Sequence, residues 1–356
     1  MKSIRVHLRN ISRRTYILLS ALLIIVFGSS VAWAMHLGAS TIPLRQYFAG
    51  NYTNAIWYWG DPDKTNQRQL GDMAEFMYLH QLNAIYVDVS KYAAVFQGAP
   101  TTQQKEQVGR FNTTMERFVN TLGQRRIKVY AAAGDTSWSN PPEWKVPLSI
   151  MQGVEQYNQL HPKAQLAGIE FDIEAYNQPG FAESSMSSKG LVLGDYLGMV
   201  DALAAENEKY TKGSHKLELG FAIPYWFDNQ NGNIPPVVRN NLMGPTLFHL
   251  LDRLNKLQKS NVVVMAYRNA ARGNDGIIFH ARTNIAYAQA KAPNVRVIIG
   301  QETTDVQPAK ITYHGMTKTD MSNQVALMEQ EFSSTGVFGG IAINDFDGYQ
   351  QLRDGN

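Results

Sequence analysis

The sequence predicts an α/β fold, a single-domain (β/α)8 TIM barrel. From residue 55 onward, short apolar runs alternate with longer stretches of helical period. Because the runs are apolar on both faces and separated by predicted helices, they indicate a parallel sheet covered by helices. A closed barrel of this kind usually takes roughly 250 residues, which a chain of 356 residues accommodates. An open doubly wound sheet is the alternative, but no Gly-x-Gly-x-x-Gly or Walker sequence marks a phosphate-binding turn.

The predicted strands are short runs rich in Val, Ile, Ala and aromatic residues. They are residues 55–61, 83–90, 127–134, 166–174, 216–224, 261–268, 295–303 and 336–346. The predicted helices lie between them, at residues 67–81, 103–122, 148–161, 192–210, 246–259, 277–290 and 321–333. Only residues 349–356 follow the last strand, so we expect the eighth helix to be missing. We expect residues 41–54 to cover that gap or to close the bottom of the barrel.

The first 34 residues have the layout of a secretory signal peptide: a basic segment up to Arg14, an apolar run and a small residue, Ala34, at the end. Residues 16–37 carry no charged side chain and are long enough to span a bilayer, so an uncleaved anchor is the alternative. Either way, we expect the rest of the chain to lie outside the cytoplasm, secreted or in the cell envelope. The expected division is a signal segment (1–34), a lead-in (35–54) and the barrel (55–356), with membrane contact only through an uncleaved signal.

The net charge of +3 comes from the signal segment, which holds five basic residues and no acid. Removing those five from the 33 bases leaves 28, against 30 acids. A chain with this balance has no basic stripe to neutralise phosphates, so we expect no nucleic-acid partner.

The chemistry is predicted to lie at the carboxyl ends of the strands, where TIM barrels hold their functional residues. These ends carry most of the chain's aromatic and acidic candidates. The candidate site residues there are Trp57, Trp59, Asp88, Trp138, Asp172, Glu174, Tyr225, Trp226, Tyr267, Arg268, Gln301, Glu302, Asn344 and Asp345.

The fourth strand is the most informative, because Glu170, Asp172 and Glu174 alternate along it and share one face. Three carboxyl groups pointing into a barrel cannot all ionise easily, so at least one pKa is expected to rise. We expect an ionised Asp172 to hold a proton on Glu174, which would make Glu174 a general acid. The alternative is a buried ion-pair network with Arg268 or Lys128.

The tryptophans indicate a carbohydrate ligand. After the signal segment, all five (Trp57, Trp59, Trp138, Trp144 and Trp226) fall at or just after predicted strand ends. Flat rings stack on the apolar faces of sugars, while nearby polar groups bind the hydroxyls. Any single tryptophan could instead fill the core.

The segment Leu166 to Glu174, which reads Leu-Ala-Gly-Ile-Glu-Phe-Asp-Ile-Glu, resembles the fourth-strand signature of the family 18 glycoside hydrolases, the chitinase-like barrels. The resemblance implies that Glu174 is the general acid, that Asp172 orients it, and that Tyr267, in Met-Ala-Tyr, assists. The sequence departs from that pattern, with Ala167 in place of Asp or Asn and Asn344-Asp345 where the family has a Trp. The chain therefore resembles the chitinase-like barrels as a divergent relative.

Glu302 leaves the mechanism open. Another large group of barrel glycosidases resembles this arrangement, with an acid on strand four and a carboxylate nucleophile on strand seven, here Glu174 and Glu302. Because the seventh predicted strand is apolar throughout, either Gln301 or Glu302 could face inward. If Glu302 points away, an N-acetyl group of the substrate would have to act as the nucleophile.

Other chemistries lack their residues. The chain has no Cys, and none of its eight His residues lies in a predicted strand, so neither a metal nor another cofactor is expected. No Gly-x-Ser-x-Gly sequence indicates a serine triad. His314 is kept as a substrate-binding candidate. The rival to an exported glycoside hydrolase is a non-catalytic carbohydrate-binding barrel of the cell envelope, in which Arg268 neutralises the acid.

Overall fold

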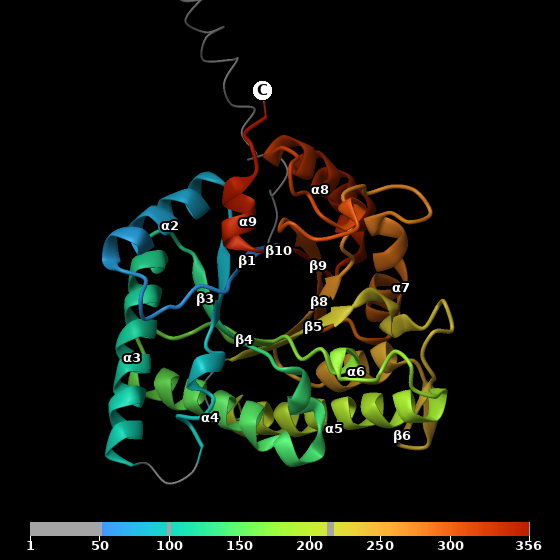
Figure 1. Cartoon of the computed structure of the whole chain (residues 1–356), viewed down its shortest axis with the longest axis horizontal. Helices are drawn as coiled ribbons and strands as arrows, with labels where there is room; N and C mark the ends of the chain where they lie inside the picture. The colour runs from blue at the N-terminus through green and yellow to red at the C-terminus, as the bar shows by residue number, and fades with distance from the viewer. Residues whose placement is uncertain (1–51, 98–100, 212–216, 356) are drawn as a thin grey trace, which may run out of the picture. The chain divides into compact units, whose positions relative to one another are not determined.

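The computed structural model describes residues 52–97, 101–211 and 217–355. These residues form a closed barrel of parallel strands in the order β1-β10-β9-β8-β5-β4-β3-β2 (Figure 1). The strands are β1 (Thr53–Tyr58), β2 (Ala84–Asp88), β3 (Lys128–Ala133), β4 (Gly168–Phe171), β5 (Glu218–Pro224), β8 (Ser260–Met265), β9 (Val295–Glu302) and β10 (Phe338–Asn344). Because β1 pairs with both β10 and β2, the sheet closes on itself. This confirms the predicted TIM barrel and excludes the open sheet.

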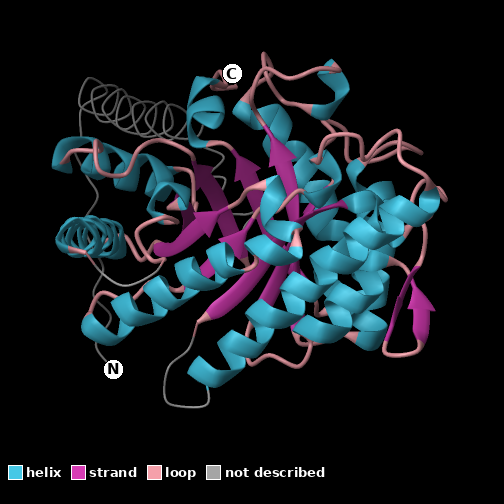
Figure 2. Cartoon of the chain, turned by 60° about the horizontal axis from the view of Figure 1, so that its bottom comes forward, coloured by secondary structure: helices cyan, strands magenta, loops and turns pink. Residues whose placement is uncertain are grey.

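Helices surround the strands on the outside of the barrel (Figure 2). They are α2 (Gln67–Leu79), α3 (Thr102–Gly123), α4 (Lys145–Leu160), α5 (Met186–Thr211), α6 (Thr246–Leu254), α7 (Ile277–Lys291), α8 (Lys318–Phe332) and α9 (Phe346–Gln351). Local sequence sets several of the starts. The Asn66 and Thr317 side chains, for example, each accept a hydrogen bond from the backbone of the third residue of their helix, as part of a capping box. The expectation of a missing eighth helix was wrong, because α9 follows β10 directly and is only short.

Two features were not predicted. A two-stranded hairpin of β6 (Val237–Arg239) and β7 (Leu242–Gly244) interrupts the chain between β5 and α6. Its turn residues Asn240 and Asn241 have positive φ angles of 50° and 62°, which suit a tight hairpin turn. The first strand also begins at residue 53, two residues before the predicted start of the barrel.

Side chains alternate along each strand between the helices outside and the barrel interior. On β4, Ile169 and Phe171 pack against the helices, and Glu170 lies on the other face. The interior cluster consists of Ala55, Trp57, Ala84, Tyr86, Tyr130, Ala132, Ala222, Val263, Ile298 and Ala342. This alternation decides which side chains reach the carboxyl end of the barrel.

The predicted signal segment and nearly all of the lead-in lie outside the described residues. Within the described ranges, no helix combines the length and the apolar character that crossing a membrane requires.

Candidate active site

A pocket of about 310 Å³ lies at the carboxyl end of the barrel. Six strands or the residues just after them supply its lining: β1, β4, β5, β8, β9 and β10. The lining residues are Trp57, Trp59, Asp172, Glu174, Ala222, Val263, Met265, Tyr267, Glu302 and Asn344. The pocket thus brings together all four predicted catalytic residues and three of the predicted binding residues.

The carboxyl groups of the fourth strand line up as predicted, starting with Glu170 deep inside the barrel. Glu170 is fully buried, and burial together with the charge of Glu218 below it raises its pKa well above the usual range. Gly220 makes room for this carboxyl group, because a Cβ atom at that position would lie 1.9 Å from Oε2 of Glu170. At neutral pH we therefore expect Glu170 to be protonated.

Asp172 lies above Glu170 and borders the pocket. Its Oδ1 atom is buried without a hydrogen-bond partner, and burial followed by the charge of Glu174 raises its pKa to about 7. The sequence prediction placed the raised pKa on Glu174 and an ionised form on Asp172. In the structure the buried carboxyl with the raised pKa is Asp172, because it lies one pleat deeper in the barrel.

Both oxygens of Glu174 accept hydrogen bonds from residues of the turn that follows it. The Tyr176 hydroxyl donates to Oε1, and the Asn177 amide donates to Oε2 at 2.7 Å. Sequence reasoning missed both residues. Their positions two and three residues after Glu174, in a tight 3-10 turn at Ala175–Asn177, were the available signal.

Glu302 faces the pocket, which answers the question that the sequence left open. Its Oε1 accepts from the backbone N–H of Thr303 at 2.9 Å and from the N–H and hydroxyl of Thr304, each at 2.7 Å. Its Oε2 accepts from the Asn344 amide at 2.7 Å. Gln301 is fully buried on the opposite face of β9, near Met328 of α8, so its prediction as a binding residue was wrong.

Tyr267 lies on β8's side of the pocket, close to all three acids. Burial raises its pKa well above the usual range, and the charges of Asp172, Glu302 and Glu174 raise it further. Its hydroxyl therefore stays protonated and can donate a hydrogen bond. Gly300 leaves space for the ring, because a Cβ atom there would lie 2.9 Å from Cε1 of Tyr267.

Trp57 and Trp59 form the aromatic wall of the pocket. Their rings stack with centroids 5.0 Å apart and planes at 11°. Trp57 is buried at 3% exposure, while Trp59 is 39% exposed and its Nε1 donates to Oδ1 of Asn344 at 2.8 Å. Trp59 is therefore the ring that can stack on a sugar, and Trp57 supports it from below.

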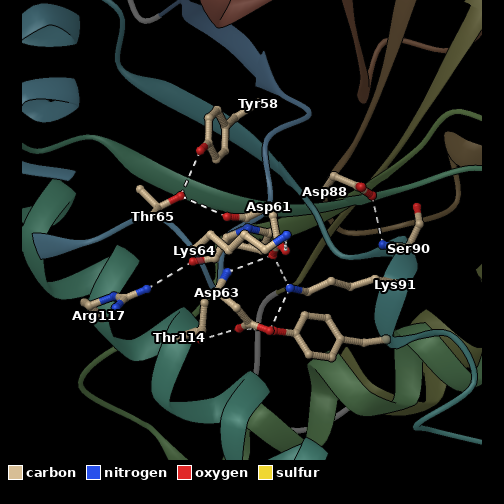
Figure 3. A network of polar contacts seen from close by, with 12 residues as sticks. Tyr58, Asp61, Asp63, Lys64, Thr65, Asp88, Ser90, Lys91, Thr114 and Arg117 are labelled. Carbon is tan, nitrogen blue, oxygen red and sulfur yellow. Dashed lines mark hydrogen bonds and ion pairs between the residues drawn. The ribbon is translucent and has the colours of Figure 1, made fainter. Parts of the chain in front are cut away.

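A polar network holds the loop that follows Trp59 (Figure 3). Lys91 donates to Asp61 and, at 2.6 Å, to Asp63. Asp63 also accepts from the hydroxyl of Thr114 on α3 at 2.7 Å. The network links the loop after β1 to the turn after β2, which holds Lys91, and to α3, which holds Thr114.

Several predicted binding residues lie away from the pocket. Trp138 is 7% exposed and belongs to the hydrophobic core. The carboxylate of Asp88 accepts from the backbone N–H of Ser90, and that of Asp345 accepts from the N–H of Gly348 as the cap of α9. These three residues do not line the pocket: Trp138 packs in the core, and Asp88 and Asp345 bind backbone N–H groups of the turns that follow them.

Trp226 and Tyr225 follow β5 but do not line the pocket. Trp226 is half-buried and packs edge-on against Tyr176 at 5.0 Å. The Tyr225 ring lies 4.0 Å from that of His280 on α7. His314 is exposed, 3.9 Å from a carboxylate oxygen of Asp305.

Arg268 does not neutralise Glu174. Its Nε and Nη2 donate to Asp275 at 2.8 and 2.7 Å, and its Nη1 donates to the carbonyl of Tyr267. Asp275 also binds Lys310 at 2.6 Å. The alternative of a buried ion pair between Arg268 or Lys128 and the acids of β4 was therefore wrong. Arg268 pairs with Asp275 instead, and Lys128 is exposed to solvent. The described ranges contain no cluster of three or more His, Asp or Glu side chains arranged to hold a metal ion.

Fold and pocket together define a TIM barrel with three carboxyl groups at its carboxyl end. No family model and no curated protein matches the sequence. Among solved structures, the chain is similar to the beta-glycosidase BGL167, with 7% identity and a TM-score of 0.52, over 84% of this chain and 87% of that one. This similarity shows the shared fold.

Two further solved structures are similar over a comparable length. One is a family 18 chitinase from Cycas revoluta, at 13% identity and a TM-score of 0.47, over 83% of this chain and 95% of that one. The other is the glycoside hydrolase domain of PgaB (BpsB) from Bordetella bronchiseptica, at 14% identity and a TM-score of 0.47, over 84% and 95%. Like the beta-glycosidase, both share little sequence with this chain.

Proposed function

We propose that this protein is a glycoside hydrolase that cleaves a polysaccharide or glycan by carboxylate acid/base catalysis. The observation that carries the proposal is the convergence of Asp172, Glu174 and Glu302 on one pocket that also holds the exposed ring of Trp59. Glycoside hydrolysis uses a pair of carboxyl groups on either side of the scissile bond. An exposed aromatic ring beside them suits the apolar face of a sugar.

Glu174 is the general acid in this proposal. Its proton passes to the glycosidic oxygen while the bond between that oxygen and the anomeric carbon breaks. Asp172, with a pKa of about 7, is neutral in a large share of molecules at neutral pH and exchanges its proton with Glu174. Tyr267 is an uncharged hydrogen-bond donor to the substrate in the same pocket.

Glu302 is the carboxylate that acts on the anomeric carbon. Three donors hold its Oε1, and one holds its Oε2, so Oε2 keeps a lone pair for the substrate. Attack by Oε2 forms a glycosyl ester as the leaving group departs. Water then attacks the anomeric carbon, its proton goes to Glu174, and the bond to Glu302 breaks, so that one water is consumed per cleavage.

The compartment is part of the proposal. The basic and apolar pattern of residues 1–34 supports export, either as a secreted protein or as one anchored in the cell envelope. An extracellular or envelope polysaccharide is then the substrate class. The proposed mechanism uses carboxyl groups and water and needs no cofactor.

To test the proposal, the full-length protein is incubated with a panel of envelope and matrix polysaccharides. Hydrolysis is measured as the release of reducing ends. Glu174→Gln keeps the shape of the side chain but carries no acidic proton, so it should bind substrate and lose at least about 100-fold in kcat. Glu183→Gln removes an exposed carboxylate outside the pocket and serves as the matched control. Full activity of Glu174→Gln on a polysaccharide that the parent cleaves would contradict the proposal.

A further inference from the structure

Each oxygen of the Glu174 carboxyl group accepts one hydrogen bond in the structure. Tyr176 donates to Oε1 and Asn177 donates to Oε2. A general acid must point an O–H group at the glycosidic oxygen, and the oxygen that carries this proton can still accept one hydrogen bond. The surroundings of the two donors therefore decide which oxygen meets the substrate.

The surroundings of the two donors differ sharply. The ring of Tyr176 packs edge-on against Trp226 at 5.0 Å and against Phe227 at 6.1 Å. Phe227 is itself buried at 1% exposure. Asn177 is exposed to solvent and can release its amide by rotating its side chain. The tyrosine is therefore fixed on Oε1, and Oε2 is the oxygen that the substrate can reach.

We propose that Tyr176 is a positioning residue for the general acid: it stays bound to Oε1 of Glu174 throughout the reaction, while the substrate takes the proton from Oε2, the oxygen on the exposed side. This inference rests on the proposed function. As the proton leaves Oε2, negative charge spreads over both oxygens of Glu174. The hydroxyl of Tyr176 then donates to a charged acceptor instead of a neutral one, and such a bond is stronger. Tyr176 therefore stabilises the transition state more than the ground state.

The hydroxyl of Tyr176 can fill this role because it remains protonated. Burial raises the pKa of Tyr176 far above its ordinary value, and the adjacent charge of Glu174 raises it further. It therefore donates a hydrogen bond and does not compete with Glu174 as a proton source. The opposing explanation is that Tyr176 only caps the turn at Ala175–Asn177 and stabilises the fold.

The experiment compares two glycosides of the same sugar that differ in the leaving group. The 2,4-dinitrophenolate leaving group departs without protonation, whereas the 4-methylumbelliferone leaving group needs more help from the acid. Both glycosides are made with glucose, galactose, xylose and N-acetylglucosamine, and the comparison uses the sugar that the parent cleaves. Tyr176→Phe should lower kcat about 10- to 100-fold on the 4-methylumbelliferyl glycoside, leave its KM unchanged and barely alter the dinitrophenyl rate.

Two control variants complete the design. Tyr157→Phe removes another tyrosine hydroxyl, one that donates to the carbonyl of Ala164 at 2.7 Å outside the pocket, and should leave both rates unchanged. Asn177→Ala should lower the kcat on the 4-methylumbelliferyl glycoside less than Tyr176→Phe does, because solvent can replace the exposed amide of Asn177.

The outcomes separate the two proposals. If the parent cleaves neither the polysaccharides nor any of these glycosides, the proposed function fails and this inference fails with it. If the parent is active, equal losses of Tyr176→Phe on both leaving groups, or a change confined to KM or to the unfolding temperature, overturn the inference alone. A larger kcat loss in Asn177→Ala than in Tyr176→Phe overturns it too, because the two donors would then have exchanged roles.

Discussion

The side-chain amide of Asn344 donates a hydrogen bond of 2.7 Å to Oε2 of Glu302. The same amide group accepts from Nε1 of Trp59 at 2.8 Å through its oxygen. One side chain at the end of β10 thus sets the orientation of both a carboxylate and the exposed ring of the pocket. An amide is suited to this place because it offers a donor on one side and an acceptor on the other.

Asn344→Asp is expected to impair the pocket more than its small change in shape suggests. The new carboxylate would keep the acceptor for Trp59 but would place a negative charge against Glu302, where the amide donated before. We expect kcat/KM on a cleaved polysaccharide to fall at least about tenfold, since a hydrogen bond to a charged group is replaced by repulsion. Steady-state kinetics measure this, and a variant with parental kcat/KM would show that the contact has no functional role.

Trp59→Ala is expected to weaken carbohydrate binding by about 1–3 kcal/mol, the value of burying a large apolar side chain. Trp59 is exposed at the pocket, while Trp138 is buried in the core. Trp138→Phe should therefore lower the unfolding temperature and leave the affinity unchanged. Isothermal titration calorimetry with an oligosaccharide that the parent binds checks both. An affinity loss in Trp138→Phe without one in Trp59→Ala would reverse the two assignments.

The sequence was sufficient to predict the barrel and the acids of the fourth strand, because strand period determines both. Apolar runs separated by helices are typical of parallel strands, and alternation places Glu170, Asp172 and Glu174 on one face. Which side chains of β9 face the barrel interior was not predictable in the same way. Gln301 and Glu302 both end an apolar run, and only the pairing of β9 with its neighbours decides which of them faces inward.

Side chains beyond the strand ends were harder to place. Trp138 follows β3 in the sequence, but it lies in a 3-10 turn and its ring packs in the hydrophobic core, so proximity to a strand end did not put it in the pocket. The distribution of protons was also out of reach, because it depends on how deeply each carboxyl group is buried. Asp172 lies deeper than Glu174 and lacks a partner on Oδ1.

Gly300→Ala is expected to disturb Tyr267 without unfolding the barrel. A Cβ atom at position 300 would lie 2.9 Å from Cε1 of that ring and 3.2 Å from the carbonyl of Val264. The ring has to move by several tenths of an ångström, which we expect to lower kcat by roughly tenfold, since misplacement of about 1 Å can cost 100-fold. Gly71→Ala is the control, because nothing lies within 4 Å of its Cβ atom on α2. Equal kinetics of the two variants would contradict the role of Gly300.

The pKa of Asp172 predicts how stability and activity change with pH. Its ordinary value is 3.8, and burial followed by the charge of Glu174 raises it to about 7 in the folded protein. Below pH 4 the carboxyl group is protonated in both the folded and the unfolded chain, so it contributes no pH dependence. Between pH 4 and pH 7 Asp172 ionises in the unfolded chain but stays mostly protonated in the folded protein. The free energy of unfolding therefore falls as the pH rises.

Asp172→Asn removes this titration while keeping the shape of the side chain. The free energy of unfolding of the variant relative to the parent should therefore rise between pH 4 and pH 8, by up to about 4 kcal/mol for a shift of this size. Urea unfolding at a series of pH values measures the difference, and comparing each variant with itself across pH cancels the effects of the substitution that do not depend on pH. The kcat/KM of the parent should decline as the pH passes 7, because an ionised Asp172 has no proton to exchange with Glu174. A stability difference that stays constant from pH 4 to pH 8 would mean that Asp172 titrates near its ordinary value, and the shared proton of the proposed mechanism would then have no source in this pair.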